Sequence, residues 1–317
     1  MKNRHALLLA ATLIAISCCG CSNRQSDTDS IQTWDVESKY LDSDVSEKGT
    51  IESLSYETRD YVDNSNKTET KKCNVYLPYQ YSKEKKYDIL YLLHGTDKQS
   101  VDHINTWFDT IQAKKVLDNM IYNQIIEPLI VVCPNTYSYG LYGDDTIKNI
   151  KDYSPVKEKS NQNFSNELRY DIVPNVEAKY STYSSSQDEA GLKASRDHRA
   201  IAGLSNGARL TLKAGMVSNF DYFSYFGCYS SSIDSSLILD AFNQEKYDGC
   251  KINYMFNADG IFDFAYNKHR KMVDELLKNG NEWFTKENTE YVKITMGYHS
   301  ARSWRVSLFD SLLRFFR

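Results

Sequence analysis

From residue 50 onward, short apolar runs alternate with longer amphipathic stretches. The apolar runs lie at residues 89–93, 128–132, 199–203, 252–256 and 291–295, and the amphipathic stretches at 107–125, 167–180, 205–216, 264–278 and 304–316. Buried parallel strands are continuous apolar runs, and their connecting helices cover both faces of the sheet. Residues 50–61 and 68–77 flank the turn-forming segment Asp63-Asn64-Ser65-Asn66, which indicates an antiparallel hairpin. We therefore predict one α/β domain over residues 50–317, with a mostly parallel central sheet, an N-terminal antiparallel hairpin and helices on both faces.

The first 21 residues have the pattern of an export signal. Lys2 and Arg4 give a positive start, and residues 6–17 form an apolar or small-residue run. This run is shorter than the roughly 20 residues that span a bilayer, but it fits the core of a signal peptide. Gly20-Cys21 then matches the junction of a bacterial lipobox, and Ser17-Cys18 is the second choice. We expect an exported lipoprotein lipidated at Cys21 or Cys18, with plain secretion as the alternative.

Charge restricts the partners of the chain. It has 38 basic and 42 acidic residues, and loss of the leader with Lys2 and Arg4 would leave 36 basic ones. A mildly acidic chain without a basic cluster has no electrostatic reason to bind nucleic acid. Residues 22–49 are polar and acidic with little apolar periodicity, so we predict a tether there. Contact with a membrane is expected only through the lipid anchor.

Four cysteines lie beyond the predicted leader: Cys73, Cys133, Cys228 and Cys250. Their spacing matches no metal-ligand pattern, and the chain has no H-E-x-x-H motif. We therefore predict no metal and no cofactor. Cys133 lies in an apolar run and is expected to be a buried hydrophobic residue, whereas Cys228 and Cys250 could form a disulfide.

Gly203-Leu204-Ser205-Asn206-Gly207 is the single G-x-S-x-G segment of the chain. It follows an apolar strand-like run and precedes a helical stretch, which is the context of a nucleophile elbow. In such a tight turn the residues two before and two after the serine must be small. The turn exposes the serine hydroxyl and places the next backbone N–H at a helix N-terminus, where it can bind an oxyanion. Ser205 is therefore the predicted nucleophile.

A second element upstream supplies the remaining oxyanion donor. Residues 91–96 (YLLHGT) are an apolar strand that runs into His94-Gly95. In α/β-hydrolases the loop after this strand donates a backbone N–H to the oxyanion. We assign the two donors to the backbone N–H groups of Thr96 and Asn206, and we expect His94 to shape the loop.

The base follows from chain order, because on this fold the nucleophile precedes the acid and the acid precedes the histidine. Beyond the predicted leader, three histidines lie before Ser205, which leaves His269 and His299. His269 lies in a charged helical stretch and is expected on the surface. His299 follows a predicted strand and precedes the last helix, so it is the predicted base.

Two carboxylates compete for the role of the acid. Asp259 and Asp263 both follow the predicted strand that ends near residue 256. Either could orient the imidazole and stabilise its protonated form. Position favours Asp263, and Asp259 next to Gly260 would then be a turn residue.

With these residues placed, the chain from about residue 50 resembles carbohydrate esterase family 1, and most of all its feruloyl esterase modules. The segments that carry the resemblance are YLLHG, EPLIVV-P, NF-x-x-E-x-R, VEAKYSTY, HR-x-x-x-G-x-S, FDFAY and the histidine six residues before Arg305 near the C-terminus. The resemblance implies the α/β-hydrolase fold, no metal, and roles for Ser205, Asp263 and His299 as nucleophile, acid and base. It also implies removal of ferulic or acetic acid from xylan side chains. Asn206 and Thr96 stand where the family has methionine and glycine, which leaves the acyl group open.

We therefore expect a serine esterase that acts through an acyl-enzyme on acylated plant-wall polysaccharide or on a small ester. Trp107, Tyr137, Tyr298 and Trp304 are candidate walls of the acyl or sugar pocket, although residue type alone favours ordinary core for each of them. One alternative is a non-catalytic surface lipoprotein that binds glycans in the same cleft. Another keeps the chemistry and acts on a different small acyl ester or a siderophore ester.

Overall fold

The computed structural model describes residues 32–33, 36, 38–41, 44–96, 103–143, 154–280 and 282–317. The predicted signal and the lipid sites Cys21 and Cys18 lie outside these residues and stay predictions. Within the described residues, no helix is both long enough and apolar enough to cross a membrane.

Nine strands of the described residues form one sheet, in the order β1-β9-β8-β7-β6-β4-β5-β3-β2. They are β1 (Gln32–Thr33), β2 (Thr50–Arg59), β3 (Thr68–Leu77), β4 (Asp88–Leu93), β5 (Leu129–Pro134), β6 (Arg199–Leu204), β7 (Tyr225–Tyr229), β8 (Tyr254–Gly260) and β9 (Thr289–Ile294). The hairpin β2–β3 and the pair β3–β5 are antiparallel, and every other pairing is parallel. The predicted fold class is confirmed, and β7 is a strand that the sequence analysis did not identify.

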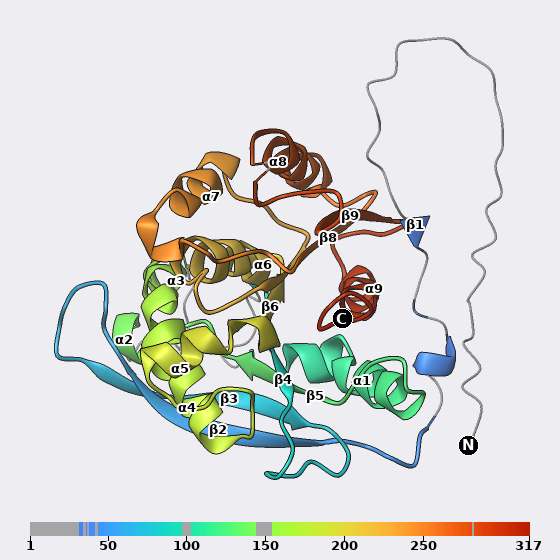
Figure 1. Cartoon of the computed structure of the whole chain (residues 1–317), viewed down its shortest axis with the longest axis horizontal. Coiled ribbons are helices and arrows are strands. Elements are labelled where there is room, and N and C mark those ends of the chain that lie inside the picture. Colours follow the sequence, from blue (N-terminus) through green and yellow to red (C-terminus); the bar gives the residue numbers. More distant parts are fainter. Residues whose placement is uncertain are drawn as a thin grey trace.

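Helices cover both faces of this sheet (Figure 1). The α-helices are α1 (Ala113–Tyr122), α2 (Tyr139–Tyr142), α3 (Ser154–Glu167), α4 (Val173–Lys179), α5 (Glu189–Ala194), α6 (Asn206–Leu210), α7 (Ser235–Phe242), α8 (Tyr266–Asn279) and α9 (Ala301–Leu312). Shorter 3-10 and π-helical pieces are η1 (Ser38–Tyr40), η2 (Thr106–Thr110), η4 (Leu168–Ile172), η5 (Arg196–His198), η6 (Thr211–Ser218) and η7 (Glu245–Tyr247). The predicted helix over residues 107–125 is divided into η2 and α1 at Gln112, whose φ of 62° is left-handed.

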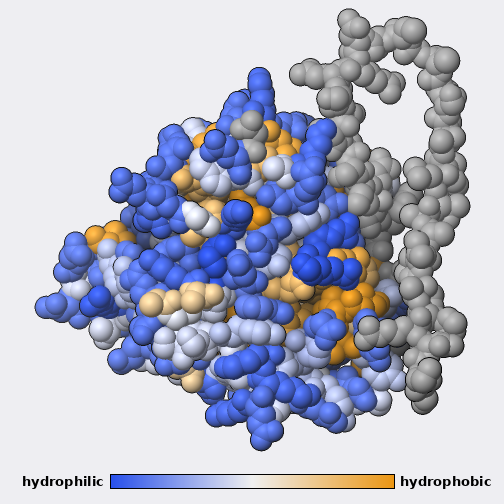
Figure 2. Space-filling model, viewed as in Figure 1, coloured by the Kyte–Doolittle hydropathy of each residue, from blue (hydrophilic) through white to orange (hydrophobic). Residues whose placement is uncertain are grey.

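Two hydrophobic cores lie on opposite faces of the sheet. On one face Leu90 and Leu92 of β4 pack with side chains of α1 and α9. On the other face Ile89 and Tyr91 of the same strand pack with α3, α4, α6, α7 and α8. The alternation of one strand between two cores explains why the central strands are apolar throughout. Figure 2 shows a mostly hydrophilic surface in this view, with apolar surface gathered beside α9 and α1.

The segment expected to be a tether contacts the domain at several described positions. Gln32 and Thr33 pair with Lys293 and Ile294 at the edge of the sheet. Val36 and Val45 are buried, and the N–H of Gly49 donates to Asp118. The prediction of a free tether over residues 22–49 is therefore wrong for these residues, because a few apolar side chains and an open sheet edge are enough to hold them.

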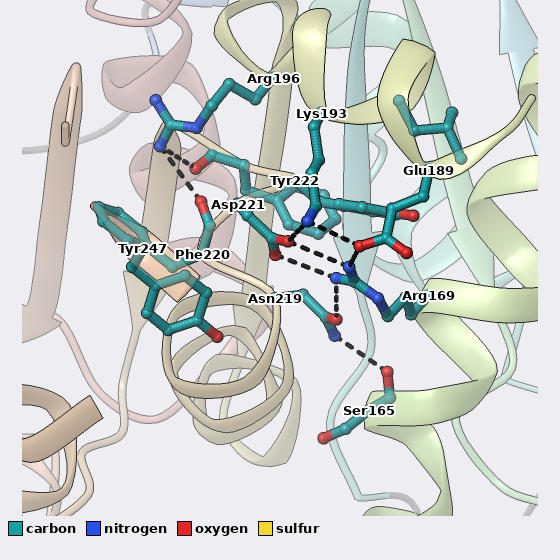
Figure 3. Close-up of polar contacts among 12 residues, drawn as sticks. Ser165, Arg169, Glu189, Lys193, Arg196, Asn219, Phe220, Asp221, Tyr222 and Tyr247 are labelled. Atoms are coloured by element: carbon teal, nitrogen blue, oxygen red, sulfur yellow. Dashed lines mark hydrogen bonds and ion pairs between the residues drawn. The ribbon is translucent and has the colours of Figure 1, made fainter. Parts of the chain in front are cut away.

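An ion-pair network joins η4 and α5 to the turn before β7 (Figure 3). Arg169 contacts both carboxylate oxygens of Asp221 at 3.0 Å, and its guanidinium also reaches Glu189 at 2.8 Å. Lys193 lies 3.1 Å from the same aspartate. Because Asp221 precedes a parallel strand, the network lies at the edge of the sheet opposite the strand ends that carry Ser205 and His299.

Candidate active site

Ser205 lies in the turn between the end of β6 and the start of α6. Its backbone angles are φ 52° and ψ −115°, a strained conformation for a residue with a side chain. Two backbone hydrogen bonds hold it: its N–H donates to Tyr229 O at 2.8 Å, and its carbonyl accepts from Arg209 N–H at 3.2 Å. The predicted strand–turn–helix context of the serine is therefore present.

The two glycines around Ser205 are required by packing. A Cβ on Gly203 would lie 2.5 Å from the carbonyl carbon of Gly207. A Cβ on Gly207 would lie 2.3 Å from Leu93 O at the end of β4. Both contacts are with backbone, so neither can be relieved by a side-chain movement. The spacing of the G-x-S-x-G segment follows from these approaches.

The structure brings Ser205, His299 and Asp263 into contact. His299 Nε2 lies 3.0 Å from Ser205 Oγ, and His299 Nδ1 lies 3.0 and 3.1 Å from the two carboxylate oxygens of Asp263. With Nδ1–H donated to the carboxylate, Nε2 is free to accept the serine proton. Of the two competing carboxylates, Asp263 is the one that contacts His299.

Asp263 is held in its charged form. Its side chain is buried, and burial alone would raise its pKa. Hydrogen bonds from His299, from the backbone N–H of Ala265 at 2.8 Å and from Ser230 outweigh burial and lower the pKa below its ordinary value. The carboxylate can therefore orient the imidazole and stabilise its protonated form.

Ser230 and Trp304 complete the surroundings of this pair. Trp304 Nε1 donates to Ser230 Oγ at 3.0 Å, and the indole meets the His299 ring edge-on at 5.0 Å between centroids. Ser230 follows β7, so it was missed together with that strand. The short apolar run at residues 225–229, which is followed by three serines, was the signal that could have revealed it.

The loop after β4 lies directly against the nucleophile. A Cβ on Gly95 would be 3.2 Å from Ser205 Cβ, so the backbone that leads to Thr96 runs beside the serine. On the other side, Asn206 begins α6, and the first N–H groups of a helix have no partner within it. Thr96 therefore follows Gly95, which lies beside Ser205, and Asn206 follows Ser205 itself. Both predicted oxyanion donors lie in backbone next to the serine.

His94 fixes the orientation of this loop. Its ring is buried, with Nδ1 2.7 Å from Gly95 O and Nε2 accepting from Thr136 N–H at 2.9 Å. Burial, together with the neighbouring His103, lowers the pKa of His94 to about 3, so the ring is neutral. The carbonyl of Gly95 and the N–H of Thr96 belong to one planar peptide group. By holding the carbonyl, His94 sets the direction of the predicted oxyanion donor, as expected for a residue that shapes the loop.

Comparison with known proteins agrees with this geometry. A model of an esterase family, described as "putative esterase", matches residues 65–315. The chain belongs to this esterase family. It is 40% identical over 216 residues to endo-1,4-beta-xylanase Y of Acetivibrio thermocellus; the match covers 65% of this chain but only 18% of that relative.

The solved structures that are similar to this chain include feruloyl esterases. It superposes with a TM-score of 0.75 and 27% identity on the feruloyl esterase module from Clostridium thermocellum, solved as an alanine variant with sinapinate, covering 91% of this chain and 95% of that one. A CE1 ferulic acid esterase from the anaerobic fungus Anaeromyces mucronatus has the same fold, with a TM-score of 0.68 and 20% identity over 89% of this chain and 96% of that one. The resemblance to carbohydrate esterase family 1 is confirmed, and the protein is a carboxylic ester hydrolase.

The four aromatic residues proposed as pocket walls have different positions in the esterase. Trp107 is fully buried and donates its indole N–H to Leu93 O at 3.0 Å, so it belongs to the core and that prediction is wrong. Tyr137 is buried too, and its hydroxyl lies 3.2 Å from Thr96 Oγ1 beside the predicted oxyanion loop. Trp304 packs on His299, whereas Tyr298 is 56% exposed next to it.

His269 is fully buried in the esterase, so its predicted surface position is wrong. Its Nδ1 lies 2.6 Å from Asp259 Oδ2, and its Nε2 lies 3.1 Å from Asn257 Oδ1. Tyr291 donates its hydroxyl to the same carboxylate at 2.9 Å. The charged neighbours of His269 in the sequence lie on the outer face of α8, which hid the inward direction of the histidine.

The cysteines take no part in the described site. Cys73, Cys133, Cys228 and Cys250 are free thiols, and Cys133 is buried as expected. Cys228 pairs in register with Asn257 within β8, whereas Cys250 precedes the start of that strand. The suggested disulfide is therefore absent between these two described residues. No group of three or more His, Cys, Asp or Glu side chains within the described ranges is arranged to hold a metal ion.

Proposed function

We propose that this protein is a serine esterase that removes feruloyl or acetyl groups from plant-wall xylan through an acyl-enzyme. The observation that carries the proposal is the line of contacts from Ser205 Oγ to His299 Nε2 at 3.0 Å, and from His299 Nδ1 to Asp263 at 3.0 Å. Ser205 is the nucleophile, His299 the general base and acid, and Asp263 the residue that orients the imidazole.

The reaction would proceed in two halves. Ser205 Oγ attacks the ester carbonyl while its proton passes to His299 Nε2, and the backbone N–H groups of Thr96 and Asn206 stabilise the oxyanion. The tetrahedral intermediate collapses, and His299 returns the proton to the departing sugar oxygen, which leaves as an alcohol. Water, deprotonated by His299, then attacks the acyl-enzyme and releases the carboxylic acid and free Ser205.

Similar proteins support the choice of substrate class. The structure with 27% identity over 91% of this chain is described as a feruloyl esterase module with bound sinapinate. The relative with 40% identity is described as an endo-1,4-beta-xylanase, which favours xylan as the polymer that carries the ester.

Substitution Ser205→Ala tests the proposal. The serine side chain is the group that forms the covalent bond, so we expect release of ferulate from methyl ferulate, and of acetate from acetylated xylan, to fall by at least about 10³-fold. Far-ultraviolet circular dichroism should show an unchanged fold. A fluorophosphonate should label the wild type at Ser205 and leave the variant unlabelled, as read by peptide mass spectrometry. Full activity of the variant, or wild-type protein that is inert to both the probe and the esters, would overturn the proposal, and the second result would favour a non-catalytic glycan binder.

A further inference from the structure

Three large aromatic side chains are exposed beside the candidate triad. Phe264 is 79% exposed, Tyr298 56% and Phe262 52%, and we refer to these three residues as the aromatic shelf. Phenylalanine is among the residue types most often buried, and contiguous exposed apolar surface marks binding sites. The shelf therefore needs an explanation that core packing does not supply.

The shelf is built on the two loops that also carry the acid and the base. The Phe264 ring lies 4.3 Å from the His299 ring between centroids, and the Phe262 ring stacks on Tyr298 at 5.2 Å. The N–H of Phe262 donates to Gly297 O at 2.9 Å, which joins the two loops directly. Between the two phenylalanines, Asp263 points inward to His299. These contacts join the shelf to the loops that carry the acid and the base.

The position of the shelf relative to His299 decides which part of an ester it faces. During hydrolysis the carbonyl oxygen points to the N–H donors of Thr96 and Asn206. The departing oxygen must instead lie within reach of His299 Nε2, because this atom returns the proton to it. The Phe264 ring lies against that same imidazole, tilted by 33° to it. The shelf therefore lies on the alcohol side of the scissile bond.

We propose that the aromatic shelf binds the sugar ring that carries the ester, together with its neighbour in the polysaccharide. This inference rests on the proposed esterase function and assigns the leaving-group subsite within it. A sugar ring presents an apolar C–H face that packs on an aromatic ring, while its hydroxyls stay in water at the exposed rim. A small alcohol such as methanol cannot make this contact.

Two esters with the same acyl group test the assignment. Methyl ferulate has no sugar, whereas a feruloylated arabinoxylan oligosaccharide presents one to the shelf. For Phe264→Ala we expect the ratio of kcat/KM for the oligosaccharide ester to kcat/KM for methyl ferulate to fall about tenfold, as for the loss of one aromatic contact of about 1.4 kcal/mol. The ratio is the readout because any shared loss through His299 cancels in it. Phe264→Trp should keep the ratio of the wild type.

Tyr183 provides a matched control. It is 44% exposed and stacks on His198 at 3.5 Å, at the edge of the sheet away from Ser205. Tyr183→Ala should therefore leave both rates and their ratio unchanged. A ratio in Phe264→Ala within twofold of the wild type would overturn the assignment.

A binding measurement separates failure of the shelf from failure of the esterase function. Titration calorimetry with the unesterified arabinoxylan oligosaccharide should give a Kd about tenfold higher for Phe264→Ala than for the wild type. If the wild type cleaves neither ester, the proposed function fails, and this titration still decides whether the shelf binds sugar. If the wild type does not bind the oligosaccharide at millimolar concentration, the shelf assignment is wrong even when both esters are cleaved.

Discussion

The contact between Gly260 and Gly297 controls the geometry of the candidate triad. Gly260 ends β8 three residues before Asp263, and Gly297 follows β9 two residues before His299. A Cβ on Gly260 would lie 2.2 Å from the carbonyl carbon of Gly297 and 2.6 Å from the backbone nitrogen of Tyr298. The backbones of the two loops therefore touch, and no side chain can be added between them without moving one loop.

The expected effect of Gly260→Ala follows from these distances. Carbon atoms pack at about 3.5 Å or more, so the loops must separate by about 1.3 Å to admit the methyl group. A misplacement of about 1 Å of catalytic groups lowers the rate about 100-fold. Overpacking of this kind also lowers the free energy of unfolding by about 1–3 kcal/mol. We expect kcat for p-nitrophenyl acetate to fall about 100-fold while the protein remains folded at 25 °C.

Gly249→Ala is the matched control for a glycine substitution far from the triad. Gly249 has a left-handed φ of 79°, and no described atom lies within 4 Å of an added Cβ. Backbone strain should lower its free energy of unfolding by about 1–2 kcal/mol without changing kcat. Urea denaturation measures stability and steady-state kinetics measures kcat for both variants. A Gly260→Ala protein with kcat within threefold of the wild type would refute the argument that this contact sets the distance from Asp263 to His299.

Two further substitutions test how the site and the scaffold are held. His94→Ala should lower kcat for methyl ferulate about 100-fold, because the Gly95–Thr96 peptide group, which carries the Thr96 N–H, loses its contact with the imidazole. Acylation measured by stopped flow should slow, with little change in KM. Asp221→Asn should lower the free energy of unfolding by about 2 kcal/mol at pH 7 in urea denaturation. Burial alone would raise the pKa of Asp221, but Arg169 and Lys193 outweigh it and lower the pKa. A lowered folded pKa gives stability that is lost as pH falls, so the difference should shrink below about pH 4. An unchanged kcat for the first variant, or a difference independent of pH for the second, would contradict these expectations.

The sequence alone predicted the parallel core and the convergence of Ser205, Asp263 and His299. Continuous apolar runs identified β4 and β6, and the turn between residues 203 and 207 fixed the direction of the chain at the sheet edge. Parallel strands end at one edge, so chain order was enough to place the base and the acid there. The choice between Asp263 and Asp259 needed coordinates, because both follow the predicted strand that ends near residue 256. In the structure Asp259 lies within β8 and is not the expected turn residue, whereas Asp263 follows the strand.

Two structural elements that the sequence did not reveal, β7 and α3, were missed for different physical reasons. A short, fully buried strand such as β7 has no alternation and resembles a buried piece of helix. The helix α3 extends from Ser154, but part of its buried face is polar: Ser160 accepts from Ser138 N–H, and Asn163 accepts from Tyr61 N–H. An apolar periodicity cannot appear where the buried side chains are polar and paired.

Buried and paired polar side chains also occur in the segments that carry the resemblance to carbohydrate esterase family 1. Four charged residues lie in these segments, and each forms an ion pair in the structure: Glu167, Arg169, Glu177 and Arg199. Glu167 pairs with Lys71 at 2.6 Å, and Glu177 pairs with Arg199 at 2.5 Å, with all four side chains nearly inaccessible. A buried charge without its partner is strongly destabilising. These residues therefore explain how the scaffold is held, and their partners could be found only in three dimensions.

Two of the histidine–aspartate pairs among the described residues use an aspartate at or just after the end of β8, and access to a nucleophile distinguishes these two pairs. Asp259 and His269 are both fully buried. The second ring nitrogen of His269 contacts Asn257, and the carboxylate of Asp259 accepts a hydrogen bond from the hydroxyl of Tyr291. His299, with a side chain that is 22% exposed, instead directs its second nitrogen to Ser205. Asp259 of the buried pair directly precedes Gly260, at the base of the loop that carries Asp263, and His269 contacts it from α8. The buried pair can therefore stiffen the end of β8 but cannot move a proton to substrate, which is why pairing with a carboxylate alone is not sufficient to identify a catalytic histidine.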